Sequence, residues 1–327
     1  MDRIVTMLRA AGDPTRLRLL LLLREAELTV SELTEIVGQS QPRVSRHLKL
    51  LSEARMIDRF KEGSWVFYRA SDRGRPAQLG GALSELAAAQ ASAILQTDLH
   101  HLANVRQARA ARAAAFFKAN AAEWERIRAL HAPDSDVEAA IVRLIAHTQG
   151  GHAPIHRFLD AGTGTGQMLE LLAPYVTQGV GVDVSPEMLA IARERVAKFQ
   201  HCQVRLADAY RLPFPNGTPL QGFDVVLFHQ VLHFLDDPQA AVIDAARVLK
   251  PGGRVLIADF APHELEYLRT DYAHRRLGFS DTEVQGWFEA AHLVSQASEA
   301  IAPTSGGELT VKIWLAQSTR ARVKEAA

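Results

Sequence analysis

The sequence predicts two domains of different class: an N-terminal α+β domain, joined by a helical linker to a C-terminal α/β domain with a mostly parallel sheet. Three observations predict this division. Helical segments and a strand pair fill residues 13–71, neither Gly nor Pro occurs from Ala82 to Ala132, and strands alternate strictly with helices after Pro154. We expect the domain boundaries at 1–78, 79–132 and 133–320. A chain of 327 residues, 47% of them hydrophobic, has room for two cores.

Charge is distributed unevenly between the two parts. Residues 1–75 hold 14 Lys and Arg against 10 Asp and Glu, whereas the remaining residues hold 23 against 27. The N-terminal excess permits contact with DNA. A single cysteine, Cys202, excludes an internal disulfide and paired-thiol redox chemistry, and no apolar run approaches membrane-spanning length. We therefore expect a cytoplasmic protein that has no membrane partner.

Three helices are predicted in the first fifty residues. Asp13-Pro14 is a typical helix start, because Asp is a favoured N-cap and Pro fits the first turn. Thr29-Val-Ser-Glu32 has the pattern of a capping box. Ser40-Gln-Pro is expected to cap a third helix, "SQPRVSRHLKLLSEA", with apolar residues on one face and polar residues on the other.

Two strands follow, "MIDRFKEG" and "SWVFYRAS", joined by a tight Glu62-Gly63 turn. The predicted order is helix, short helix, turn, polar-faced helix and hairpin, which is the order of a winged helix-turn-helix. In this motif the helix after the turn, here the polar-faced helix, enters the major groove of DNA. The alternative is a small packing module whose polar helix face is only solvated. We expect seven residues to contact DNA, five on the polar-faced helix and two on the hairpin: Gln41, Arg43, Ser45, Arg46, His47, Arg59 and Lys61.

The stretches "GDPTRLRLLLLL" and "LTVSELTEIVGQSQPRVSRHLKLL", with the hairpin, resemble the ArsR/SmtB family of dimeric bacterial repressors over residues 1 to about 75. The resemblance implies a homodimer on a palindromic operator. Members often sense metals through two cysteines in an "ELCVCDL" stretch, but this chain has Thr29 and Ser31 in those places. Hydroxyls are poor ligands for thiophilic ions, so we expect no metal there.

The helical linker leaves two questions open. His100 and His101, with Asp98 nearby, are compatible with a second type of metal site, but we favour a solvated or interface pair because adjacent helical residues point about 100° apart. Helices of this segment are expected to contribute to the dimer interface, with a plain connecting helix as the alternative. The aromatic residues Phe116, Phe117 and Trp124 are expected in a core rather than over a ligand.

Past Pro154, five strands are predicted at "IHRFLD", "GVGVDVS", "CQVRLAD", "FDVVLFH" and "GRVLIADF", with helices after most of them. Two late segments, "LVSQASEAIA" and "LTVKIWLAQ", are expected to complete the sheet as an antiparallel pair. Ligands of such sheets bind at the carboxyl ends of the strands. The stretch "LDAGTGTG" lies at the end of the first strand and places Asp160 before Gly162, Gly164 and Gly166.

Further acidic residues follow the next strands. Asp183 comes 17 residues after Gly166, where a carboxylate accepts both hydroxyls of a ribose, and Asp208-Ala209 is placed to hold an adenine edge. A nicotinamide-binding loop reads G-x-G-x-x-G and has no carboxylate before it, because the pyrophosphate is anionic. Asp160 instead favours a ligand that carries an amino group.

The loop and "FDVVLFHQVLHFLDDPQAAVIDAARVLKPGGRVLIADF" resemble the class I S-adenosylmethionine-dependent methyltransferases, over roughly residues 112–317. The resemblance implies a Rossmann-like sheet of seven strands and S-adenosylmethionine or S-adenosylhomocysteine as the cofactor, with no metal. It places Asp160 and the glycines at the methionine end, Asp183 at the ribose, and His229 beside the sulfonium. Asp208 and Ala209 would hold the adenine, and Met188 would lie against it or in the core.

The catalytic residues stay open. His229 and His233 are candidates for a general base, and a structural hydrogen bond is the alternative for each. In the segment where this fold varies to choose its acceptor, five charged or titratable residues face a substrate or form surface ion pairs: His263, Glu264, His274, Arg275 and Arg276. No Asn/Asp-Pro-Pro-Tyr element is present, and the lone cysteine argues against arsenic methylation through thiolates.

Together the two parts resemble known fusions of an ArsR-type regulator with a methyltransferase-like domain. The first hypothesis is a dimeric transcription factor in which the adenosyl ligand changes operator affinity. The second is an active small-molecule methyltransferase whose DNA-binding domain regulates its own operon or serves dimerisation. A nicotinamide oxidoreductase is a third reading.

Overall fold

The computed structural model describes residues 2–62, 65–71, 74–90, 92–121, 134–146, 155–303 and 309–320. The chain forms two compact units, Met1–Arg112 and Ala113–Ala327, each with its own buried core. Gly63 of the expected hairpin turn, Trp124 and the last part of the expected linker helices, residues 122–132, lie outside the described residues.

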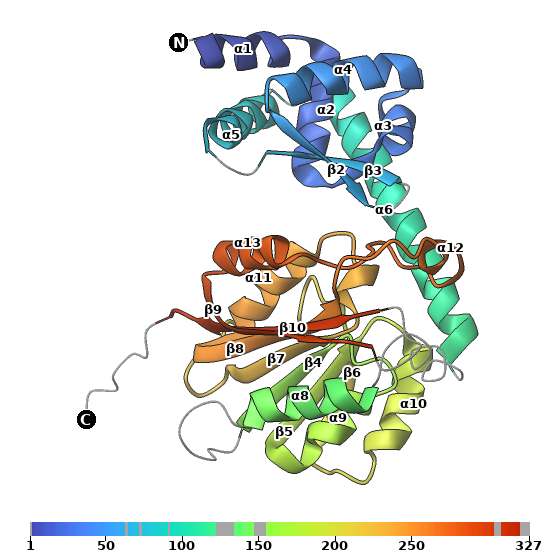
Figure 1. Cartoon of the computed structure of the whole chain (residues 1–327), viewed down its shortest axis with the longest axis vertical. Coiled ribbons are helices and arrows are strands. Elements are labelled where there is room, and N and C mark those ends of the chain that lie inside the picture. Colours follow the sequence, from blue (N-terminus) through green and yellow to red (C-terminus); the bar gives the residue numbers. More distant parts are fainter. Residues whose placement is uncertain are drawn as a thin grey trace. The chain divides into compact units, whose positions relative to one another are not determined.

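The first unit has the predicted order of helices and hairpin (Figure 1). Its sheet has the strand order β1-β3-β2, with antiparallel pairing. Neither the first helix nor the two-residue strand β1 was predicted. The elements are α1 (Asp2–Ala11), α2 (Pro14–Glu25), β1 (Leu28–Thr29), α3 (Val30–Val37), α4 (Gln41–Glu53), β2 (Ile57–Glu62), β3 (Trp65–Ala70), α5 (Gly74–Ala89) and α6 (Ala93–Asn120).

All three expected residues are N-caps, and two of them make side-chain capping hydrogen bonds. The Asp13 side chain accepts a hydrogen bond of 3.0 Å from the Arg16 backbone N–H. Thr29 and Glu32 form a reciprocal capping box at the start of α3. Ser40 is the N-cap residue of α4, as expected, but its side chain makes no capping hydrogen bond. Burial of the apolar face of α4 and Pro42 in its first turn hold that helix start instead.

Gly80-Gly81, which precedes the stretch without Gly and Pro, does not interrupt the helical segment, because both glycines lie within α5. A Cβ on Gly80 would meet the Arg24 guanidinium at 3.1 Å, so the missing side chain admits Arg24 against the helix. Packing thus overrides the weak helix propensity of glycine. The interruption lies instead between Ala89 and Ala93.

The second unit contains a seven-stranded sheet, as predicted, and the structure gives its strand order as β6-β5-β4-β7-β8-β10-β9. The first five strands in that order are parallel, and β10 pairs antiparallel with β8 and β9. The strands are β4 (Ile155–Ala161), β5 (Val176–Asp183), β6 (Cys202–Leu206), β7 (Phe223–His229), β8 (Leu249–Phe260), β9 (Leu293–Ile301) and β10 (Val311–Ser318).

Helices cover both faces of this sheet (Figure 1). The helical segments are α8 (Asp134–Ala146), α9 (Gln167–Leu172), η2 (Ala173–Tyr175), α10 (Pro186–Val196), η3 (Leu232–Phe234), α11 (Pro238–Val248), α12 (Tyr267–Asp271) and α13 (Asp281–Ala290). One core lies between the sheet and α11 with α13, and the other between the sheet and α8 with α9. The strand order reverses between β4 and β7, and the crevice at such a switch point is where these sheets bind ligands.

Among the described helices, none is both long and apolar enough to cross a membrane.

Candidate functional site

The loop after β4 requires glycine. Gly162, Gly164 and Gly166 have φ values of +81°, +53° and +82°, a region that other residues rarely adopt. A Cβ on Gly162 would lie 2.4 Å from Cγ2 of Val231, in the loop after β7. The sequence signal "AGTGTG" therefore reflects both backbone conformation and the close approach of two loops at the switch point.

Asp160 anchors this loop at the carboxyl end of β4. It is 1% exposed, and the Thr163 hydroxyl donates a hydrogen bond of 2.6 Å to its Oδ2. The backbone N–H groups of Gly162 and Thr163 both donate to the Val182 carbonyl, at 2.8 and 2.9 Å. Thr163 was not singled out from the sequence, although its place in the glycine loop, four residues before the start of α9 at Gln167, is the available signal.

Asp183 ends β5 beside the same loop. Its carboxylate accepts hydrogen bonds from the backbone N–H groups of Gly164 and Ser185, each at 2.9 Å. Burial raises the pKa of Asp183 above its ordinary value, although these backbone donors act in the opposite direction. The residue as a whole is nevertheless partly exposed.

Two exposed apolar residues flank Asp183. Val184 is 57% exposed, and Leu206, the register partner of Asp183 on β6, is 60% exposed. The sequence analysis missed both, because an apolar residue at a strand end is indistinguishable from core. Exposed apolar side chains at neighbouring strand ends suit the faces of a flat apolar ring.

The other predicted cofactor residues are spread around this edge. Asp208 is exposed, two residues beyond the end of β6 rather than on it, and accepts a hydrogen bond from the Tyr210 N–H. Ala209 is buried, and so is Met188, which is 2% exposed on α10. His229 is the last residue of β7 and is 9% exposed.

The loop after β7 brings together residues that the sequence did not connect. His233 lies in η3 with its Nδ1 at 2.7 Å from Oδ1 of Asp259, at the end of β8. Gln230 has a φ of +50°. Neither Asp259 nor Gln230 was predicted as a site residue, since only the register of β7 against β8 places Asp259 beside this loop.

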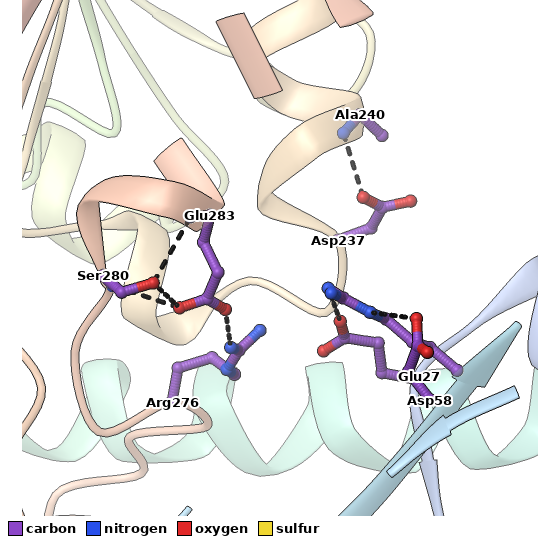
Figure 2. A network of polar contacts seen from close by, with 8 residues as sticks. Glu27, Asp58, Asp237, Ala240, Arg276, Ser280 and Glu283 are labelled. Carbon is purple, nitrogen blue, oxygen red and sulfur yellow. Dashed lines mark hydrogen bonds and ion pairs between the residues drawn. The ribbon is translucent and has the colours of Figure 1, made fainter. Parts of the chain in front are cut away.

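Residues of the predicted acceptor segment are partly engaged in ion pairs. Arg275 lies 2.6 Å from Asp236, and Arg276, which is 4% exposed, lies 2.6 Å from Glu283 (Figure 2). Burial acts to raise the pKa of Glu283, but Arg276 and Ser280 outweigh it and lower the pKa. Glu264 is exposed, and His263 is half-buried. The His274 ring stacks on His233 with centroids 4.1 Å apart.

The predicted DNA-contacting residues have different exposures. Six of the seven residues are exposed, four on α4 and two on β2: Gln41, Arg43, Ser45, Arg46, Arg59 and Lys61. His47 is the exception, because its side chain is only 12% exposed and its Nδ1 lies 3.8 Å from Asp13. The structure therefore turns His47 toward the start of α2.

Two of the three residues considered for a second metal site contact other groups. Asp98 is 1% exposed and forms a bidentate ion pair with Arg18, with both N···O distances at 2.6 Å. Nδ1 of His101 lies 3.1 Å from the Ile36 carbonyl oxygen. No group of three or more His, Cys, Asp or Glu suited to a metal ion occurs among the residues that the structure describes.

Comparisons with known proteins match both units. Residues 13–59 match the bacterial regulatory proteins of the arsR family, and residues 159–257 match the methyltransferase domain. The chain is 34% identical over 171 residues to the uncharacterised methyltransferase C1B3.06c of Schizosaccharomyces pombe, covering 45% of this chain and 60% of the relative. It is 41% identical over 103 residues to demethylmenaquinone methyltransferase of Tropheryma whipplei, covering 32% of this chain and 41% of the relative. The chain thus spans less than two thirds of the length of each.

The fold is shared with solved methyltransferase structures. One is a chain of the complex between the Trm112 methyltransferase activator and a methyltransferase from Haloferax volcanii, with a TM-score of 0.52 and 21% identity. That match covers 64% of this chain and 98% of the other. The protein therefore joins a helix-turn-helix domain of the bacterial arsR regulatory family to a methyltransferase domain of the class I fold.

Proposed function

We propose that the protein is a dimeric, DNA-binding transcriptional regulator whose methyltransferase domain binds S-adenosylmethionine or S-adenosylhomocysteine and thereby changes operator affinity. The observation that carries the proposal is the site at the β4–β7 switch point, in the same chain as an arsR-type domain with an exposed, polar α4. The alternative is an active methyltransferase with an autoregulatory DNA-binding domain.

The residues at the switch point suit an adenosyl ligand. Gly162 permits close approach of the backbone, Asp160 and the glycine loop would hold the amino acid end, and Asp183 would accept the ribose hydroxyls. Val184 and Leu206 add apolar surface for the adenine, next to Asp208 and Ala209. Met188 would lie beneath the adenine, and His229 would lie beside the sulfonium.

Dimerisation is supported by an apolar surface on the first helix. Ile4, Val5 and Leu8 of α1 are 41%, 41% and 49% exposed. Contiguous exposed apolar side chains on one helix indicate a protein contact, and a second copy of this chain fits the two-fold symmetry of an operator with half-sites about 10 bp apart.

Helix α6 contributes residues to both units, because the boundary between them falls inside it. In the first unit, Arg109 pairs with Glu32 of the α3 capping box. In the second, Phe117 packs against Phe234 with ring centroids 4.8 Å apart, next to His233. A ligand shifts DNA affinity only if it binds two conformations unequally.

The division of the chain into domains at residues 1–78, 79–132 and 133–320 stays a prediction.

The decisive experiment is fluorescence anisotropy of the full chain on DNA from its own upstream region, at fixed salt, titrated separately with S-adenosylmethionine and S-adenosylhomocysteine. A change in operator affinity of about tenfold or more, equivalent to about 1.4 kcal/mol of coupling, supports the regulator. If both ligands bind and neither changes DNA affinity, the enzyme is the better description.

Arg46→Ala is expected to abolish sequence-specific DNA binding, because a bidentate Arg–base contact provides about 1–3 kcal/mol of discrimination per site and a dimer has two. Anisotropy on operator and scrambled DNA measures this, and calorimetry should show unchanged ligand affinity. Lys49→Ala removes the same charge from the same exposed helix and should weaken both DNAs equally. Retained discrimination by Arg46→Ala contradicts the assignment.

Asp183→Asn is expected to weaken binding of the adenosyl ligand about 100-fold, since two hydrogen bonds to a charged acceptor contribute about 3 kcal/mol or more. Ribose hydroxyls donate to the ionised carboxylate, and burial raises its pKa in the free protein. Affinity should therefore be constant above this raised pKa and fall as the pH drops through it. Calorimetry at several acidic pH values checks the trend, which should be absent in Asp183→Asn.

A further inference from the structure

A buried histidine and a buried aspartate lie together at the carboxyl ends of β7 and β8. His233 is 1% exposed, Asp259 is 0% exposed, and His233 Nδ1 lies 2.7 Å from Asp259 Oδ1. Asp259 also accepts hydrogen bonds from the backbone N–H groups of Leu232, at 3.0 Å, and Phe260, at 2.8 Å. Because so many donors converge on this carboxylate, it acts as an acceptor toward Nδ1, which leaves the lone pair of a neutral His233 on Nε2.

The second nitrogen of His233 is left for a ligand. Nε2 is buried and makes no hydrogen bond to any other residue that the structure describes. Both amide atoms of Gln230, three residues earlier, are in the same situation, in a backbone with a φ of +50°. Buried polar groups without partners and strained backbone are rare, and they concentrate at ligand sites. Val231, between the two, lies against Gly162 of the proposed adenosyl site.

Aromatic rings surround His233. Its ring centroid lies 4.1 Å from Phe234, 4.1 Å from His274 and 5.0 Å from Phe260. Such an environment accommodates a flat ring.

The charged side chains of Arg275 and Arg276, which lie beside His233 in space, form ion pairs with acidic residues. The backbone N–H groups of Arg275 and Arg276 donate to the His233 carbonyl at 2.9 and 3.0 Å, while their side chains pair with Asp236 and Glu283. His263 packs against Phe260 with centroids 6.0 Å apart. Among the described residues, Asp259 and His274 are titratable groups that directly contact the His233 ring.

From this geometry we infer that His233, oriented by Asp259, is the general base for a neutral phenolic or enolic hydroxyl that accepts the methyl group. The inference rests on the proposed adenosyl site, where S-adenosylmethionine supplies a methyl carbon attached to a positively charged sulfur. The acceptor O–H bond breaks and its proton moves to His233 Nε2. A bond forms from the oxygen to the methyl carbon while the carbon–sulfur bond breaks, and its electron pair stays on sulfur to give S-adenosylhomocysteine. Asp259 stabilises the imidazolium that results.

A first test needs no turnover. The full chain is mixed with S-adenosylhomocysteine, which has no methyl group to transfer, and with 4-nitrophenol, whose phenolate absorbs visible light. We expect the bound probe to ionise at a lower pH than the free probe. His233→Asn should remove this shift, because Asn retains a donor near the Nδ1 position and lacks Nε2. Asp259→Asn should also remove it, by reversing the tautomer. His156→Gln, exposed on β4, is the matched control and should preserve it.

A second test compares methyl transfer from S-adenosylmethionine to phenol and to 4-nitrophenol. At a pH where 4-nitrophenol is already ionised, His233→Asn should lower the rate with phenol about 100-fold or more and the rate with 4-nitrophenol less than about threefold. Equal losses with both acceptors assign His233 a structural role and overturn the inference.

Calorimetry with S-adenosylmethionine separates the two levels of the proposal. If the wild-type chain binds this ligand but neither shifts the ionisation of 4-nitrophenol nor methylates either phenol, the acceptor inference fails while the adenosyl site stands. If the ligand does not bind at all, the proposed function itself fails.

Discussion

Gly162→Ala is expected to destabilise the second unit by about 3 kcal/mol or more and to weaken binding of the adenosyl ligand about 100-fold or more. Two effects add at this position. The φ of +81° is unfavourable for any residue with a Cβ, at about 1 kcal/mol. The new methyl would also lie 2.4 Å from Val231 Cγ2 and 2.9 Å from Val231 Cβ, so one of the two loops at the switch point must move.

Two further variants separate these effects. Gly252 has a similar φ of +75°, but a Cβ there would meet nothing closer than Gln317 Nε2, at 3.7 Å. Gly252→Ala should therefore lower stability by about 1 kcal/mol and leave ligand affinity unchanged. Val231→Ala combined with Gly162→Ala should recover part of the affinity, because it removes the nearest methyl. Equal ligand affinity of Gly162→Ala and wild type, by calorimetry, would show that the ligand does not use this loop.

The parallel sheet could be predicted from the sequence because each buried strand is a short apolar run that ends at a polar or glycine-rich loop. "FDVVLFH" coincides with β7 from end to end, and the two late segments form the antiparallel pair as expected. Asp160 and Asp183 could be proposed for the same reason: carboxyl ends of adjacent parallel strands meet at one edge, so their sequence positions carry spatial information.

Other features depended on tertiary packing. The periodicity of α1 is ambiguous because several of its apolar residues, such as Ile4 and Leu8, remain exposed in the single chain. Gly80 is a weak helix former by propensity, but it lies within α5, where Arg24 packs against it. Asp259 lies in an apolar strand, 26 residues from its partner His233, and only the pairing of His229 with Ala258 brings the two together. Propensity and local motifs contain none of this information.

Arg18→Ala is expected to destabilise the first unit by about 3–5 kcal/mol, because it leaves the carboxylate of Asp98 buried without its cation. Asp98 is 1% exposed and lies on α6, whereas the Arg18 side chain on α2 is 22% exposed and also donates to the Val37 carbonyl at 3.2 Å. The hydrogen bonds to Asp98 raise the pKa of Arg18, as expected for a cation held by a close carboxylate. Asp98→Ala should therefore lower stability less, by about 1–3 kcal/mol, since the arginine that remains reaches water.

This asymmetry has a direct consequence for regulation, because Arg18 and Asp98 join α2 to the helix that continues into the second unit. Amide hydrogen exchange in α2 and in the first half of α6 measures the stability of the first unit separately from the second. The exposed pair Lys49–Glu53 in the same unit is the control, and Lys49→Ala should change exchange by no more than about 0.5 kcal/mol. Equal effects of Arg18→Ala and Asp98→Ala would show that burial of the carboxylate does not decide the outcome. If the asymmetry holds, Asp98→Ala is the less destabilised variant, and its DNA-binding domain remains folded. This variant therefore tests whether loosening α6 abolishes the effect of the adenosyl ligand on DNA affinity.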